Sequence, residues 1–307
     1  MSRRANGTGP VPPWVLALAA MFSVQLGAAL SVHLIAVVGP AGTAWLRFSA
    51  GAVIFLALAR PPLRAIRRHD VLALLGLGVT TGLETTAFLA AIERIPLGTA
   101  VAVEFLGPLT VAAARSQNRR ALAWPAVAAT GVVLLTQPWY GEVSAAGLGF
   151  AGLAAIGWAI YILLTQRVGD RFAGLAGLSL TTPIAAATAA AAGIPQAAGH
   201  LTAGILLVAA GLGILLPVLP FAFEMLALRH MTHTAFGTLM ALEPAFGVLL
   251  GLIVLHQKPS AIQIGGLLLV VLGGAAAQRG GRRGPRATDR EAAVSGPDLA
   301  GQPAETG

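Results

Sequence analysis

The chain has 307 residues, of which 56% are hydrophobic and only 10% charged, with a mean hydropathy of +0.78 and a formal net charge of +8. A soluble domain carries about 25% charged residues, so this composition excludes a chain that lies mainly in water. The lack of cysteine excludes disulfides and thiolate metal sites, and the single lysine, Lys258 before Pro259, excludes a Walker-type ATP site. We therefore predict an all-α integral membrane protein.

Apolar segments follow one another along most of the chain. A helix needs about 20 apolar residues to cross the hydrocarbon core of a bilayer, and ten such transmembrane helices are predicted between short polar connections. They lie at residues 13–34, 40–59, 71–91, 96–114, 121–137, 146–165, 175–193, 203–228, 234–255 and 260–277. Residues 1–12 are predicted as a polar cytoplasmic segment. Residues 278–307, rich in Arg, Gly and Pro, are predicted as a disordered cytoplasmic tail.

Lysine and arginine are divided unequally between alternate connections. One set of connections, together with both termini, holds 17 of these residues, whereas the opposite set holds only Arg94 and Lys258. Arg47 is the one that lies within a predicted span. The positive-inside rule then places both termini in the cytoplasm. The basic charge is therefore interpreted as a topology signal, and no nucleic-acid partner is expected.

Two stretches that start 136 residues apart resemble each other. They are Phe88–Pro108 (FLAAIERIPLGTAVAVEFLGP) and Glu224–Pro244 (EMLALRHMTHTAFGTLMALEP). Each has an apolar block, a short charged turn, a run of small residues and a Glu shortly before a Pro. This predicts two five-helix repeats, residues 13–137 and 146–277, and because five is odd the second must be inverted in the membrane. Inverted repeats are typical of secondary transporters, which hold substrate near the midplane between the halves.

Five ionisable side chains fall at bilayer depth, where each is costly to insert. They are Arg47, Glu84, Glu104, Glu224 and Glu243. Arg47, Glu84 and Glu104 share a similar predicted depth, so we expect Arg47 to pair with Glu84, Glu104 or both. Four glutamates to one arginine leave at least two carboxylates without a fixed cation, as candidates for proton carriage or for binding a substrate ammonium group. The alternative is that these charges form ion pairs that only hold helices together.

Helix-breaking prolines distinguish two of the glutamates. Pro108 follows Glu104 and Pro244 follows Glu243. A proline frees the backbone carbonyl one turn earlier, and at bilayer depth such a carbonyl must be covered by protein or line a cavity. We therefore expect Glu104 and Glu243 to be functional.

The predicted substrate-binding or proton-coupling set also includes Gln25, Phe88, Trp158 and Tyr161. Trp158 and Tyr161 are one helical turn apart, and form either an aromatic belt at the inner interface or a cavity wall that contacts a cationic group. Gln25 lies in mid-span, where it belongs to the site or forms a hydrogen bond between helices. His230 and His233 are too few for a metal site, and no hydrolase motif occurs, so neither a metal, a cofactor nor an enzymatic activity is expected.

Three long segments carry a resemblance to a known family: Ile95–Leu109 (IPLGTAVAVEFLGPL), Gly157–Gly169 (GWAIYILLTQRVG) and Leu219–Gly247 (LPFAFEMLALRHMTHTAFGTLMALEPAFG). With them, the chain resembles the drug/metabolite transporter superfamily with two EamA-type halves, in the branch of the bacterial threonine and homoserine exporters. The resemblance implies a ten-helix inverted-repeat fold and export of small amino acids or related metabolites, driven by the proton-motive force.

The resemblance also bears on single residues. It implies that Glu104, Glu224 and Glu243 occupy the positions of the family's signature carboxylates, and that Arg47 matches an arginine of the second span. Glu84 and the Arg-rich tail depart from the pattern.

The predicted function is secondary active transport: export of a small amino acid in exchange for protons across the bacterial inner membrane. The two halves would rock around a cavity lined by the first, third, fourth, sixth, eighth and ninth spans, and a homodimer is possible. Efflux of drugs or other cationic compounds is the alternative within transport. A membrane enzyme or a scaffold that transports nothing is the alternative from other classes.

Overall fold

The computed structural model describes residues 11–59, 66–115, 123–137, 139, 144–169, 172, 175–228, 230, 231 and 233–280. All the secondary-structure elements within these ranges are helices, and the ranges contain no strand. The first sequence half forms α1 (Pro13–Leu58), α2 (Arg68–Ile92), α3 (Leu97–Glu104), α4 (Leu106–Ala114) and α5 (Ala123–Thr136). The second forms α6 (Ala145–Gly169), α7 (Leu175–Ala197), α8 (Ala203–Gly213), the π-helix η4 (Ile214–Val218), α9 (Leu219–Leu228), α10 (His233–Met240), α11 (Glu243–Leu255) and α12 (Ala261–Gly280).

The length and apolar character of the helices fit a multi-pass membrane protein. Seven helical stretches in the described ranges are long and apolar enough to cross a bilayer. All ten predicted ranges coincide with helices: α1 covers the first two, whereas α5 and α12 cover the fifth and tenth and are shorter apolar helices. Ten crossings therefore stay a prediction. The predicted N-terminal segment and C-terminal tail lie almost wholly outside the described residues.

A break inside α1 separates the first two predicted spans. Gly39 adopts a φ of +73°, in the left-handed region that glycine tolerates best, and Pro40 follows it. The helix that restarts there has unsatisfied amide groups at its beginning. Oε1 of Gln196, at the end of α7, accepts hydrogen bonds from the backbone amides of Ala41 at 2.9 Å and Gly42 at 3.3 Å. A residue from the second half of the sequence thus caps a helix of the first half.

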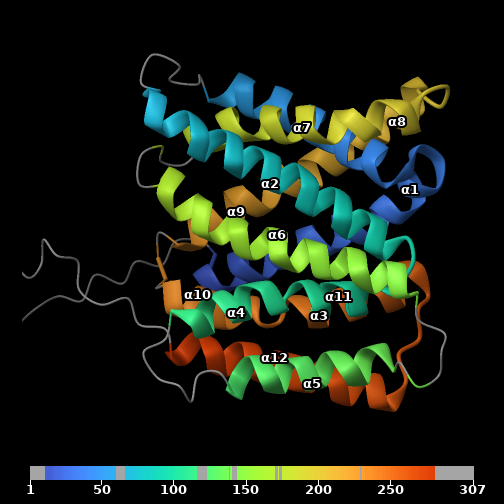
Figure 1. The fold of residues 1–307 in the computed structure, drawn as a ribbon, viewed down its shortest axis with the longest axis vertical. Coiled ribbons are helices and arrows are strands. Elements are labelled where there is room, and N and C mark those ends of the chain that lie inside the picture. The colour runs from blue at the N-terminus through green and yellow to red at the C-terminus, as the bar shows by residue number, and fades with distance from the viewer. Residues whose placement is uncertain are drawn as a thin grey trace, which may run out of the picture.

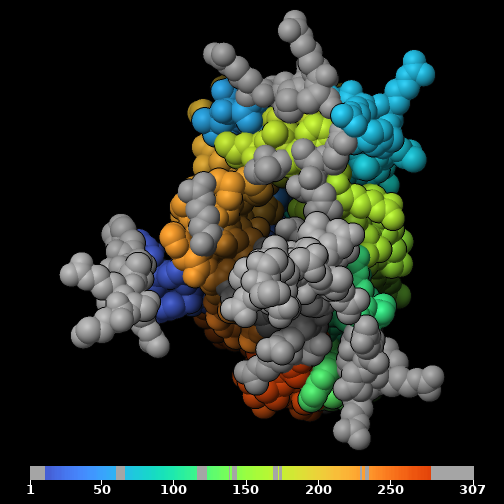
Figure 2. All heavy atoms as spheres, turned by 90° about the vertical axis from the view of Figure 1, so that its left-hand side faces the viewer, coloured from blue at the N-terminus to red at the C-terminus, as the bar shows by residue number. Residues whose placement is uncertain are grey.

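The helices lie side by side, as Figure 1 shows, with α7, α8 and part of α1 at the top and α5 and α12 at the bottom. Between them, α1 packs on α7, α2 packs on α6 and α7, and α5 packs on α12. The start of α2 and the ends of α4, α6 and α12 lie on the left of Figure 1, whereas the α2–α3 turn and the α11–α12 connection lie on the right. Figure 2 looks onto that left-hand side, where elements of both sequence halves are visible side by side.

Replacing Gly39 by alanine tests the break in α1. An added Cβ would overlap the side chain of Gln196, and the positive φ is strained for any residue with a Cβ, at a cost of about 1–3 kcal/mol. We expect Gly39→Ala to lower the thermal unfolding midpoint of the detergent-purified protein. Gly149→Ala is the matched control, because open space surrounds Gly149 in α6; an equal midpoint for the two variants would contradict this account.

Candidate transport site

Glu104 lies at a break in the middle of an apolar helical stretch. It is the last residue of α3; Phe105 forms a turn, and α4 begins at Leu106. Pro108, in the first turn of α4, has no N–H to donate to the carbonyl of Glu104, which is why the helix does not continue regularly here. The Glu104 side chain is buried, at 7% exposure. The carboxylate of Glu104 therefore lies at the point where the helix lacks a backbone hydrogen bond.

The second half of the sequence contains a similar break. α10 ends at Met240, a turn follows, and α11 begins at Glu243 with Pro244 as its next residue. Pro244 cannot donate to the carbonyl of Met240, one turn earlier. Glu243 is 6% exposed. Both helical stretches thus break next to the prolines that predicted a break, and a buried carboxylate lies at each break.

Glu84 is held against a neighbouring helix by a glycine. It projects from α2 toward Gly157 of α6, where an added Cβ would lie 2.6 Å from the Cβ of Glu84. Thr85 donates a hydrogen bond from Oγ1 to Oε2 of Glu84 at 3.2 Å. The carboxyl groups of Glu84 and Glu104 are close enough to interact electrostatically. Three helices, α2, α3 and α6, therefore meet at this pair.

Gln25 connects α1 to the break between α10 and α11. Its Nε2 donates to Oε1 of Glu243 at 3.4 Å, which links α1 to α11. The remaining oxygens, Oε1 of Gln25 and Oε2 of Glu243, are both buried without a hydrogen-bond partner. Gln25 thus forms a hydrogen bond between helices and also belongs to the acidic cluster, two roles that the sequence presented as alternatives.

Arg47 does not form the direct ion pair expected from the sequence. Its Nη1 donates to Oγ of Ser31 at 2.9 Å, and Ser31 in turn donates to the carbonyl of Gly27 at 2.6 Å. No carboxylate among the described residues lies within ion-pair distance of Arg47, although Glu84 is near enough to interact with it electrostatically. Nε of this arginine, which is 4% exposed, has no hydrogen-bond partner. The guanidinium group is bonded instead to the serine on the first segment of α1.

The other predicted residues surround this cluster. Glu224 of α9 is half-buried and interacts electrostatically with Tyr161 and Glu243. Trp158 packs edge-on against Phe105, with ring centroids 6.1 Å apart and an interplanar angle of 61°. Tyr161 packs instead toward apolar residues of α2 and α7. The two aromatic side chains therefore have different packing partners, and their role as an aromatic belt or a cavity wall stays a prediction.

Phe88 packs against the largest apolar cluster of the described residues. The structure thus brings together Gln25 and the four glutamates, with Arg47 within electrostatic range of Glu84. The roles of these residues remain predictions. No group of three or more potential metal ligands occurs in the part of the chain that is described.

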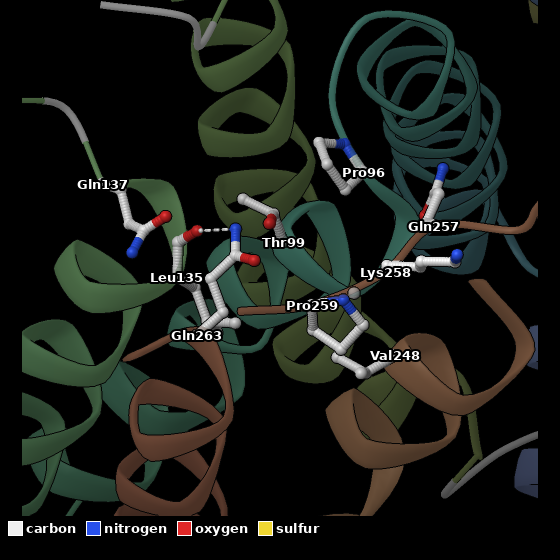
Figure 3. A pocket seen from close by; sticks show the side chains of 10 residues that line it. Pro96, Thr99, Leu135, Gln137, Val248, Gln257, Lys258, Pro259 and Gln263 are labelled. Carbon is white, nitrogen blue, oxygen red and sulfur yellow. Dashed lines mark hydrogen bonds between the residues drawn. The ribbon is translucent and has the colours of Figure 1, made fainter. Parts of the chain in front are cut away.

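A pocket of about 370 Å³ is lined by residues of the α2–α3 turn, the end of α5 and the α11–α12 connection. The α2–α3 turn and the α11–α12 connection lie on the right of Figure 1. Figure 3 shows polar side chains from both sequence halves around the pocket, among them Thr99, Gln137, Gln257 and Gln263. Most of these amides bond to the protein: Gln263 donates to the carbonyl of Leu135 at 3.0 Å, and Oε1 of Gln257 accepts from the amide of Leu97 at 3.0 Å.

Sequence reasoning missed these glutamines. The available signal was a polar amide at a span end close to a proline, as at Gln257 and Pro259. The glutamates are not among the residues that line this pocket.

Comparison with known proteins gives a consistent family. The model of the EamA-like transporter family matches residues 145–276. The threonine/homoserine exporter RhtA of Salmonella typhimurium (strain LT2) is 34% identical over 273 residues, which cover 87% of this chain and 92% of the relative. RhtA of Escherichia coli (strain K12) is 36% identical over 256 residues, covering 82% and 86%. The chain belongs to the EamA-like transporter family.

A solved crystal structure shares the fold. It superposes with a TM-score of 0.59 and 21% sequence identity, covering 88% of this chain and 99% of that chain. The family and these relatives are transporters, which favours transport over an enzymatic activity.

Replacing Arg47 by methionine separates a structural ion pair from a functional charge. Breaking a buried ion pair by removing one partner costs about 3–5 kcal/mol, and this cost does not arise where no pair exists. Because Arg47 bonds to Ser31 and to no described carboxylate, we expect Arg47→Met to keep the unfolding midpoint of the wild type and to lose transport. A large fall in the midpoint would instead support helix locking by charge.

Proposed function

We propose that this protein exports a small amino acid of the threonine and homoserine class in exchange for protons. The coarse function, transport, follows from the family. The substrate class is supported by the names of the relatives that are 34–36% identical. Proton coupling is supported by one observation above all: four glutamates gather at bilayer depth with no described basic residue paired to them.

The chemistry of the cluster suits a zwitterion. An ammonium group needs hydrogen-bond acceptors, and Oε1 of Gln25 and Oε2 of Glu243 are acceptors without partners. A carboxylate needs donors, and Nε of Arg47 is a buried donor without a hydrogen-bond partner. Arginine binds carboxylates through its N–H groups. Protons and an amino acid are accordingly the proposed partners; a homodimer stays a prediction from the sequence.

The arrangement is proposed to be two inverted five-helix repeats with ten crossings. Some of the helix contacts support this, because they recur when the halves are exchanged. The two segments of α1 correspond to α6 and α7, α2 to α8–α9, α3–α4 to α10–α11, and α5 to α12. The equivalent helices α5 and α12 contact each other, and the contact of α2 with α6 has its counterpart in the contact of α9 with α1.

A pair of glycines adds local support for a two-fold relation. A Cβ added to Gly131 of α5 would lie 2.5 Å from the carbonyl oxygen of Gly266 of α12, and one added to Gly266 would lie 2.6 Å from that of Gly131. Reciprocal contact of this kind is expected where two equivalent elements meet at a two-fold axis.

Both termini are proposed to be cytoplasmic. Arg68 begins α2, Arg115 ends α4 and Arg167 lies in the last turn of α6, and these helix ends lie on one side of the bundle in Figure 1. Arg94 and Lys258 lie in the connections on the other side. Such a bias supports an inner-membrane protein with the arginine-rich side in the cytoplasm.

Cysteine labelling tests the orientation directly, because the chain has no cysteine of its own. His69, whose side chain is 64% exposed, and the exposed Lys258 lie on opposite sides. A membrane-impermeant maleimide should label Lys258→Cys in intact cells, and His69→Cys only after the membrane is permeabilised. The reverse pattern would invert the proposed topology.

Transport is best measured as uptake of radiolabelled threonine or homoserine into inverted membrane vesicles, with and without a protonophore. We expect uptake that collapses with the proton gradient. Glu104→Gln and Glu243→Gln should abolish it while the protein stays folded, because an amide cannot exchange a proton between the two sides. Wild-type uptake by either variant would remove that glutamate from the mechanism, and resistance to cationic dyes without amino-acid uptake would favour a drug transporter.

A further inference from the structure

A buried polar pair joins the two sequence halves and is incompletely hydrogen-bonded. Gln25 of α1 is 2% exposed and Glu243 of α11 is 6% exposed, and one hydrogen bond of 3.4 Å connects them. The second oxygen of each group has no partner. A buried acceptor left unpaired costs about 1–3 kcal/mol. Two such acceptors on a pair that is already in contact therefore indicate that a donor belongs there.

The missing donor can be a single proton. A carboxylate only accepts hydrogen bonds, whereas a carboxylic acid both donates and accepts, as a carboxamide does. With a proton on Oε2, Glu243 can donate to Oε1 of Gln25 while Nε2 of Gln25 continues to donate to Oε1 of Glu243. The acid and the amide are then joined by two parallel hydrogen bonds, and no acceptor on either group is left unpaired.

We propose that Gln25 and Glu243 form the proton site of the transporter, and that the bound proton fastens α1 to α11. This deepens the proposed function and rests on it. The proton forms an O–H bond at Oε2 of Glu243 and leaves to water or to a neighbouring group. On its departure one of the two hydrogen bonds is lost, and the contact between the sequence halves is weakened at bilayer depth.

The same acceptors serve the substrate after the proton has left. Oε1 of Gln25 and Oε2 of Glu243 can then accept from the N–H groups of an ammonium ion. Proton and ammonium are alternatives, because each needs the same two oxygens. A site that binds either the proton or the substrate ammonium group, but never both at once, allows the transporter to exchange one for the other.

The surroundings of Glu243 favour a positively charged occupant. The titratable groups that act on it electrostatically are Glu224 of α9, Glu84 of α2 and Glu104 at the end of α3. All three are acidic, and no described basic residue forms an ion pair with Glu243. Gly247, one turn further along α11, lies beside Oε1 of Gln25, since an added Cβ would be 3.5 Å from that atom. The amide therefore lies close to the α11 backbone.

Two spin labels can report the contact between α1 and α11. The rings of Phe22 and Phe246 touch edge-on across these helices, with centroids 6.4 Å apart. Each is one helical turn from a member of the pair, and the lack of native cysteine leaves Phe22→Cys and Phe246→Cys as the only labelling sites. Dipolar broadening of the labelled protein in nanodiscs, at acidic and alkaline pH, then measures their separation.

In the otherwise unchanged protein, we expect the labels to be closer at acidic than at alkaline pH. Glu243→Gln should keep them close at both, because two amides form the same pair of hydrogen bonds without a titrating proton. Gln25→Leu should lose the acidic-pH approach, and it tests the site from the other helix if Glu243→Gln fails to fold. Glu224→Gln is the matched control, a nearby carboxylate not bonded to Gln25, and should keep the pH response.

Two results would overturn the proposal: a pH response that persists in Glu243→Gln or Gln25→Leu, or one that disappears in Glu224→Gln. Measuring threonine exchange by the same variants in proteoliposomes distinguishes failure of the proton-site proposal from failure of the proposed function. A pH-dependent distance without threonine exchange would support the proton site and reject the substrate. Proton-driven threonine exchange without a pH-dependent distance would support the transporter and reject the site.

Discussion

The structure depends on one constraint: hydrocarbon solvates neither charged side chains nor unpaired backbone groups. Each ionisable residue at bilayer depth must therefore be received by protein or by water. Glu104 and Glu243 are buried at helix breaks, and Glu84 lies against α6 rather than on the outside of the bundle. Glu84 and Glu243 accordingly lie at contacts between helices of the two sequence halves.

Small residues allow helices of the two sequence halves to approach each other closely. Glycine and alanine let helix backbones approach one another in membranes, where no hydrophobic force drives helices together. Gly107 of α4 lies on the backbone of Ala155 in α6, and Gly82 of α2 lies on that of Ala185 in α7. Gly157 of α6 likewise lets α2 approach closely, because the missing Cβ leaves room for the side chain of Glu84. Packing thus determines where the carboxylates can be.

Helix positions could be read from the sequence because apolar length and helix-breaking prolines are local properties. The breaks at Phe105 and before Glu243 follow from Pro108 and Pro244 in the same way. The partner of Arg47 could not be read, because depth along a helix says nothing about the direction in which a side chain points. The sequence offered Glu84 or Glu104, whereas the structure provides Ser31, on the preceding segment of the same helix.

The glutamines that cap helices were missed for a related reason. Gln196 lies 155 residues from Ala41, and Gln257 lies 160 residues from Leu97. A side chain this far away in sequence leaves no local pattern at the helix that it caps. Both capped helices follow a proline and belong to the first half, and both glutamines belong to the second. The devices that join the halves are therefore the ones least visible in the sequence.

Incomplete hydrogen bonding of buried polar groups supports the proposed carrier site over a purely structural contact. If the buried charges only held helices together, their donors and acceptors would be saturated by one another, since unpaired buried groups are costly. Arg47 instead keeps an unpaired Nε, and Gln25 and Glu243 each keep an unpaired oxygen. A ligand shifts a conformational equilibrium only by as much as it binds the two states differently. Polar groups that the protein leaves unsatisfied in one state give a proton or a substrate a way to bind that state more tightly than the other.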